Sequence, residues 1–212
     1  MDLSFKKHNN NQSKLIVSFG GLHRNMGGIP MFEFTNSLSA MNIRSDIMFL
    51  KDVSKQWYLG ELPGIGINIQ HTIAFLKSEI KKYKSVTFMG VSAGGYASIL
   101  FGSLLKIKSV IAWGPQTDLE YAKNICIESD NHPICKLEST LGQVYKEYSN
   151  LKKHINSSTN YYLYNYCEEE DFLHSSYHFE NLIQYKTVNR IDSHVRELVA
   201  NKQLEEFLIK RI

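Results

Sequence analysis

Short, almost continuous apolar runs alternate along this chain with segments whose apolar residues recur at helical spacing. The pattern predicts strands over 14–21, 45–50, 85–91, 107–114, 160–166 and 184–188. It predicts helices over 31–41, 64–83, 93–105, 172–183 and 193–211. Short apolar strands without strict polar alternation are typical of a parallel sheet covered by helices on both faces. The sequence therefore predicts an α/β fold.

Residues 118–158 differ in character from the rest of the chain. They are polar, are interrupted by the turn sequence SDNHP, and contain one predicted helix over 141–151. A chain of 212 residues has the length of one ordinary domain. We therefore interpret residues 1–212 as a single domain that carries residues 118–158 as an insertion or small cap.

Composition excludes several classes of function. The chain is 43% hydrophobic and 21% charged, with a formal net charge of +3 and no basic stripe, so neither nucleic acid nor an anionic membrane is an expected partner. The polar start lacks the apolar core of a secretory signal, and no apolar run approaches the roughly 20 residues that span a bilayer. We expect a cytoplasmic protein without a membrane span.

The cysteines give no indication of a metal site. Their number, three (Cys126, Cys135 and Cys167), is odd, which favours reduced thiols. Cys126, His132 and Cys135 could suggest zinc, but structural zinc sites use four ligands in paired short spacings, and the fourth is missing. We expect no metal.

The stretch TFMGVSAGGYASIL (87–100) contains the strongest motif. It fits G-x-S-x-G with Gly90, Ser92 and Gly94, between a predicted strand and a predicted helix, which is the context of a nucleophile elbow. A serine on such a sharp turn needs small neighbours, and the helix that follows favours developing negative charge. The alternative is a glycine-rich turn in which Ser92 only caps the helix. We predict that Ser92 is a nucleophile.

A serine nucleophile needs a histidine to take its proton and an acid to orient that histidine. In the order typical of this elbow, the acid follows a later strand and the histidine comes last. The strand at 160–166 is followed by an acidic cluster, from which we choose Asp171, with Glu170 as the alternative. His194 follows the final predicted strand. His174 and His178 follow the acids within one helical segment, in what would be the wrong loop.

An oxyanion hole needs two backbone N–H donors. Ala93, directly after the nucleophile, is predicted to supply one. The second is expected from the glycine turn after the first strand, at Gly21 or Leu22, unless these glycines only end the strand. His23 and Arg24 would then lie near the mouth of the site. Trp113 and Gln116 follow the next strand and are predicted to line the pocket, although a core tryptophan and a turn would explain them equally well.

These motifs together resemble α/β-hydrolase-like proteins of bacterial surface-polysaccharide gene clusters. The resemblance runs from about Lys14 to the C-terminus and is carried by GVSAGGYASILFG, GPQTD, a D-x-x-H at Asp171–His174 and the late His194. It implies an α/β-hydrolase-like three-layer sandwich with a mostly parallel sheet. It also implies Ser92, Asp171 and His194 as nucleophile, acid and base. One departure is that His194 stands in IDSH rather than after two glycines.

The predicted function is serine-dependent acyl transfer through a covalent acyl-enzyme. Hydrolysis of a small acyl ester or thioester, which requires no cofactor, is the first interpretation. The resemblance, whose group includes capsule O-acetyltransferases, implies the alternative, a transferase that uses acetyl-CoA as co-substrate and a saccharide as acceptor. A catalytically inactive binding or interaction protein of the same fold is the third possibility. Self-association is left open.

Overall fold

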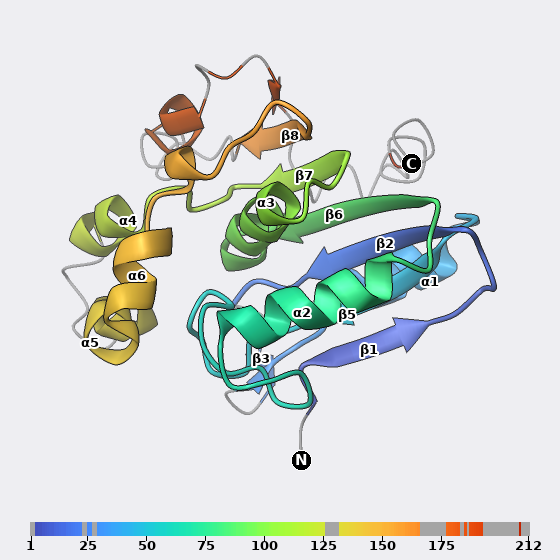
Figure 1. Ribbon diagram of the computed structural model, residues 1–212, viewed down its shortest axis with the longest axis horizontal. Coiled ribbons are helices and arrows are strands. Elements are labelled where there is room, and N and C mark those ends of the chain that lie inside the picture. Colours follow the sequence, from blue (N-terminus) through green and yellow to red (C-terminus); the bar gives the residue numbers. More distant parts are fainter. Residues whose placement is uncertain are drawn as a thin grey trace.

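Seven strands form the central sheet of the protein, in the order β1-β5-β2-β6-β7-β8-β9 (Figure 1). The computed structural model describes residues 3–22, 25–26, 29–125, 132–165, 177–182, 185, 187–192 and 208. The strands of this sheet are β1 (Phe5–His8), β2 (Lys14–Phe19), β5 (Asp46–Leu50), β6 (Ser85–Val91), β7 (Ser109–Trp113), β8 (Asn160–Asn165) and β9 (Val188–Asp192). A separate pair joins β3 (Asn25–Met26) to β4 (Ile29–Pro30).

Every neighbouring pair in the large sheet is parallel except one. β1 runs antiparallel to β5, with Phe5 opposite Leu50 and His8 opposite Ile47. The sequence analysis interpreted these residues as part of a polar leader. The structure corrects this, because they form a strand of the sheet. FKKH is short, charged and only half-buried, as is usual for an edge strand that must not recruit another chain, so it lacks the apolar run by which the other strands were found.

Helices cover both faces of the sheet. They are α1 (Thr35–Ala40), α2 (Ile69–Ile80), α3 (Ala93–Leu104), α4 (Leu119–Ile125), α5 (Leu137–Leu141) and α6 (Gln143–Tyr148), with 3₁₀ turns η2 (Pro133–Lys136) and η3 (Leu151–Lys153). Figure 1 shows α4, α5 and α6 grouped beyond the carboxyl ends of β6 and β7. This group occupies the region 118–158 that differed in composition.

The alternation of side chains along the strands creates two cores. Leu15, Val17 and Phe19 of β2 point to one face, where they pack with α2 and α3. Ile16 points to the other face, where the core includes Leu38 of α1 and also Leu208. Both faces are therefore buried, as the unbroken apolar strands predicted, and the three-layer α/β architecture is confirmed.

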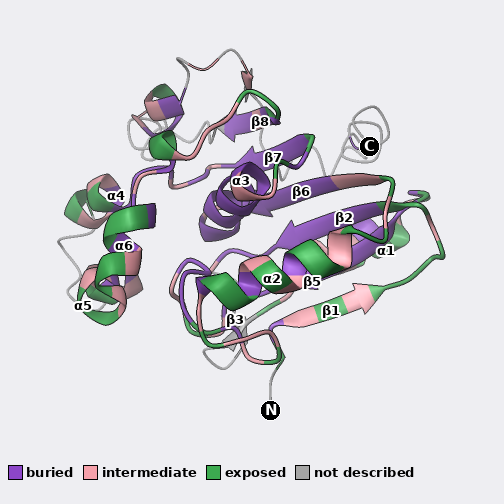
Figure 2. Ribbon diagram, in the orientation of Figure 1, coloured by how far each residue is buried: buried purple, intermediate pink, exposed green. Residues whose placement is uncertain are grey.

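The central helix α3 is buried almost from end to end (Figure 2). Its apolar composition, AGGYASILFGSL, leaves no polar face for solvent, which is what a helix enclosed on all sides requires. Gly102 lies against Val110 of β7 and leaves no room for a side chain there. Because α3 is packed this closely, the turn that begins it is held rigidly against the sheet.

Several element boundaries differ from the sequence predictions, and three of them have an identifiable cause. The last strand is Val188–Asp192 rather than 184–188, because its pairing with β8 sets the register. The predicted helix 141–151 corresponds to the shorter α6, and Gly142, whose φ is 53°, separates it from α5, most of which lies before the predicted range. α2 begins only at Ile69, because the Asn68 side chain accepts the N–H of His71 and caps the helix there.

Candidate active site

Ser92 occupies a strained turn between β6 and α3. Its backbone angles are φ 53° and ψ −119°, a region that non-glycine residues rarely adopt and that clusters at functional sites. Its amide N–H donates to the Trp113 carbonyl at 2.9 Å, and its carbonyl accepts the Tyr96 N–H at 2.9 Å. The Ser92 side chain makes no capping hydrogen bond to the helix, so the interpretation of this serine as a helix cap does not describe the structure.

The neighbouring glycines make the turn possible. A Cβ on Gly90 would collide with the backbone of Gly94, and a Cβ on Gly94 would collide with the backbone of Phe19. Neither backbone can move, because Phe19 belongs to the central strand β2 and Gly94 to the buried helix α3. The spacing G-x-S-x-G therefore has a direct steric cause: β2, the end of β6 and the start of α3 meet within contact distance around Ser92.

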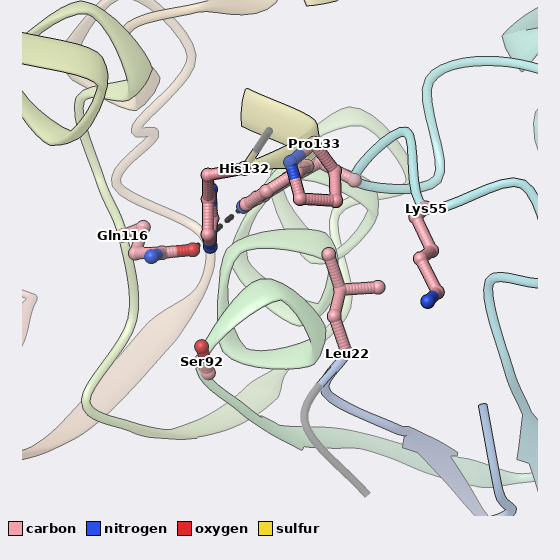
Figure 3. Close-up of a pocket in the computed structure, with 7 residues that line it drawn as sticks. Leu22, Lys55, Ser92, Gln116, His132 and Pro133 are labelled. Carbon is pink, nitrogen blue, oxygen red and sulfur yellow. Dashed lines mark hydrogen bonds between the residues drawn. The ribbon is translucent and has the colours of Figure 1, made fainter. Parts of the chain in front are cut away.

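Ser92 opens into a pocket with a volume of about 170 Å³. The pocket lies at the carboxyl ends of parallel strands, where ligands bind in open α/β sheets. β2 is followed by Leu22, β6 by Ser92, and β7 by Gln116 (Figure 3). The residues that line the pocket are Leu22, Lys55, Trp57, Ser92, Gln116, His132 and Pro133.

One wall of the pocket is the loop that follows β5. Trp57 is 1% exposed, and its indole N–H donates to Gln116 Oε1 at 2.7 Å. This bond links the loop to the segment after β7, 59 residues away. The next residue, Tyr58, is buried and donates its hydroxyl to the Gly20 carbonyl at 2.7 Å. The wall is thus tied to the segments that follow β2 and β7.

A buried carboxylate organises this loop. Asp52 is 0% exposed, and its Oδ2 accepts the N–H of Gln56 at 2.6 Å and of Tyr58 at 3.0 Å. Oδ1 has no hydrogen-bond partner in the described part of the chain. Burial raises the pKa of Asp52 to about 6, because desolvation of the charged form outweighs the stabilising backbone N–H groups.

Asp52 should make folding stability depend on pH in a definite direction. Its pKa in the folded state is above the unfolded value of 3.8, so the folded protein binds more protons between about pH 4 and 6, and stability falls as pH rises through that window. The full effect is on the order of 3 kcal/mol at neutral pH. The asparagine of Asp52→Asn cannot ionise. In urea unfolding, the free energy of unfolding of the variant should therefore rise relative to that of the wild type from pH 4 to pH 7. Parallel stability curves would contradict the assignment.

The two candidate oxyanion donors after β2 are not equivalent. The Gly21 N–H donates to Glu33 Oε2 at 2.8 Å, so this amide is already engaged within the protein. Leu22 lines the pocket together with Ser92. Ala93 is the first residue of α3, where backbone amides lack an intrahelical acceptor. Ala93 and Leu22 therefore remain the pair of candidate donors.

The structure places the two residues predicted to line the pocket differently. Gln116 lines it. Trp113 is 1% exposed and packs in the second core against Phe34 and Tyr164, with ring centroids 5.6 and 5.2 Å away. It is a core tryptophan, which is a correction. His23 and Arg24, the acids Asp171 and Glu170, and His174 and His194 lie outside the described residues.

Of the histidines in the described part of the chain, only His132 lines the pocket. Its ring lies 6.2 Å from the Trp57 ring, and its Nδ1 accepts the Ile134 N–H at 3.3 Å. An Nδ1 that accepts this bond leaves the proton of a neutral ring on Nε2. His178 is 3% exposed, and its Nδ1 accepts the Asp118 N–H at 3.3 Å.

The part of the chain that the structure describes shows neither a group of metal ligands nor a membrane-spanning helix. Among the described residues, no three His, Cys, Asp or Glu side chains are grouped as metal ligands would be; Cys126 lies outside them. No helix in the described ranges has both the length and the apolar character needed to cross a membrane.

Sequence reasoning missed the wall formed by Lys55 and Trp57. A signal was present: KDVSKQWY directly follows the apolar strand 45–50, and residues after parallel strands meet at one edge of the sheet. The segment contains no recognisable motif, so its local sequence does not mark it as part of a site.

The sheet order, the elbow and the pocket at the strand ends define an α/β-hydrolase fold. No family model matches the chain, and no curated protein matches it in sequence. The capsule O-acetyltransferase of Neisseria meningitidis serogroup A is similar in structure, with a TM-score of 0.68 at 14% identity over 98% of this chain and 92% of that one.

Two hydrolytic enzymes show the same likeness. Esterase B of Lactobacillus rhamnosis has a TM-score of 0.63 at 13% identity, over 95% of this chain and 76% of that one. The monoacylglycerol lipase of Paleococcus ferrophilus has a TM-score of 0.60 at 15% identity, over 99% of both chains. At these identities the similarity establishes the fold, and the chemistry has to be argued from the site.

Proposed function

We propose that this protein is an enzyme that transfers an acyl group through a covalent intermediate on Ser92. The observation that carries the proposal is the strained backbone of Ser92, whose hydroxyl makes no cap and which opens into a pocket. Strain of this kind costs about 1–3 kcal/mol and persists where function needs it. The structural likeness to esterases, a lipase and an O-acetyltransferase supports the same chemistry.

The proposed reaction has two steps, acylation of Ser92 and transfer of the acyl group to an acceptor. Ser92 Oγ attacks the carbonyl carbon of an ester or thioester and gives its proton to His194, which Asp171 orients. The carbonyl oxygen becomes negative and is stabilised by the N–H groups of Ala93 and Leu22. The alcohol or thiol then leaves with the proton from His194. An acceptor hydroxyl attacks the acyl-enzyme in the same manner, and Ser92 regains its proton.

The order of the strands supports these partners. β8 ends at Asn165 and β9 ends at Asp192, both parallel to β7 or to each other, so their carboxyl ends share the sheet edge of Ser92. Asp171 and His194 follow these two ends in the sequence. This is the order Ser, Asp, His of the α/β-hydrolase triad.

Hydrolysis of a small ester or thioester is the first form of the proposal, with water as the acceptor. A specific observation favours a second form, acetyl transfer from acetyl-CoA to a saccharide. The capsule O-acetyltransferase matches 98% of this chain and 92% of its own, and a mutant of that enzyme is known in complex with CoA. The two forms share every step up to the acyl-enzyme.

Intact-mass measurement after incubation with acetyl-CoA or 4-nitrophenyl acetate tests the proposal. We expect one added acetyl group on Ser92. An adduct that water discharges identifies a hydrolase, whereas an adduct that persists until a saccharide is supplied identifies a transferase. If no adduct forms with either donor, and a fluorophosphonate also fails to label Ser92, the protein is a non-catalytic member of the fold.

A further inference from the structure

We propose that Lys55 makes this pocket select substrates that carry an anionic group, a carboxylate or a phosphate, on the part bound away from Ser92. The inference deepens the proposed acyl transfer and rests on it. Figure 3 shows Lys55 on the far side of Leu22 from Ser92. A substrate whose acyl carbon lies at Ser92 would therefore extend its remaining part toward the ammonium group.

The described side chains that line the pocket carry positive charge and no negative charge. Among the described residues that line it, Lys55 is the one lysine or arginine, and none is an Asp or Glu. The other described lining groups are apolar or are neutral donors and acceptors, and His132 is the one further titratable side chain among them. A single cation in a partly enclosed, otherwise neutral pocket attracts an anion more strongly than the same cation in open water.

Lys55 also differs from the other partly buried lysines. Lys7 pairs with Glu79, and Lys123 pairs with Glu138 at 2.9 Å. Lys55 is half-buried as well, but no described carboxylate lies within ion-pair distance of its ammonium. A lysine at a pocket without an internal partner is available to a ligand.

The backbone around Lys55 is held in an unfavourable conformation. In the described chain, seven non-glycine residues have positive φ, and three of them, Lys55 (54°), Trp57 (54°) and Ser92 (53°), line this one pocket. Such conformations cluster at active sites and ligand clamps. The Asp52 carboxylate and the Trp57–Gln116 bond hold the loop in place. The strained backbone therefore places Lys55 and Trp57 at the same pocket as Ser92.

Three matched acetyl esters test the inference: 3-acetoxybenzoate, 3-acetoxyphenyl phosphate and neutral 3-acetoxybenzamide. The quantity measured is the ratio of kcat/KM for each anionic ester to that for the amide. We expect Lys55→Met to lower this ratio by about tenfold, the change expected from losing one charge-assisted hydrogen bond. Lys55→Arg should retain most of it. The two anionic esters show whether carboxylate or phosphate is preferred.

Lys106→Met is the matched control. Lys106 has the same φ of 54° and lies just beyond the end of α3, on the exposed surface, so its loss should leave the ratio unchanged. A ratio that Lys55→Met does not change, or that Lys106→Met lowers equally, would overturn the inference.

A binding measurement keeps the test separate from catalysis. Calorimetry with the Ser92→Ala protein should show tighter binding of 3-acetoxybenzoate than of 3-acetoxybenzamide, and adding Lys55→Met should remove the difference. If the wild type hydrolyses none of the esters but this difference is present, the proposed chemistry fails and the anionic selectivity stands. Equal binding of the two compounds contradicts the selectivity whatever the turnover.

Discussion

Ser92→Ala is expected to lower the turnover of an activated acetyl ester by roughly 10,000-fold or more, as loss of a triad nucleophile does. In the proposed mechanism the Ser92 hydroxyl forms the acyl-enzyme, and within the described part of the chain it is the one serine hydroxyl that lines the pocket. The rate is measured with 4-nitrophenyl acetate, and the acetyl adduct is followed by intact mass. Both signals should disappear together.

Ser98→Ala is the matched control for this variant. Ser98 lies in α3, the helix that follows Ser92, is 0% exposed, and donates its hydroxyl to the Gly95 carbonyl at 2.8 Å, away from the pocket. Its replacement removes one internal hydrogen bond, so activity should remain near that of the wild type. Turnover that survives Ser92→Ala, in a protein whose circular dichroism and thermal unfolding are unchanged, would refute the seryl mechanism.

His194→Ala is expected to lower the same rate by roughly 1,000-fold or more, because without a base the Ser92 hydroxyl stays protonated. Asp171→Asn should also lose most of the rate, since it removes the carboxylate that is proposed to orient the histidine. The pH dependence of kcat/KM should change as well, and the wild type should lose activity as the base becomes protonated. Steady-state rates between pH 5 and 9 provide this comparison.

Two other histidines distinguish this assignment from its competitors. His132 lines the pocket, but its Nδ1 accepts a backbone N–H, so His132→Ala should mainly raise KM. His174→Ala should have little effect. If His174→Ala or His132→Ala abolishes turnover while His194→Ala does not, the base has been assigned to the wrong residue.

The parts of the fold that depend on local pattern were predictable from the sequence. β2, β5, β6 and β7 are buried on both faces, so they appear as unbroken apolar runs. β1 could not be found this way, since only its partner β5 makes it a strand. The start of β9 depends on the register with Tyr161 of β8, and no local run of residues carries that information.

The elbow was predictable for the same reason, because its strain and its glycines lie within a few residues of each other. The wall formed by Lys55 and Trp57 was not. Its position depends on the burial of Asp52 and on a bond to Gln116, 59 residues from Trp57. The prediction for Trp113 was wrong for a related reason. Its place at a strand end suggested a pocket residue, whereas its aromatic neighbours Phe34 and Tyr164, distant in the sequence, bury it in the core.

The chain has two tryptophans, and they lie in very different surroundings. Trp113 is enclosed in the core, while the Trp57 indole borders the pocket and donates to Gln116. Replacing Trp113 by phenylalanine would leave Trp57 as the sole indole fluorophore of the protein. The fluorescence emission of Trp57 would then report on pocket occupancy. The affinities of ligands for a protein without the Ser92 hydroxyl could be compared by fluorescence titration, with no need for turnover.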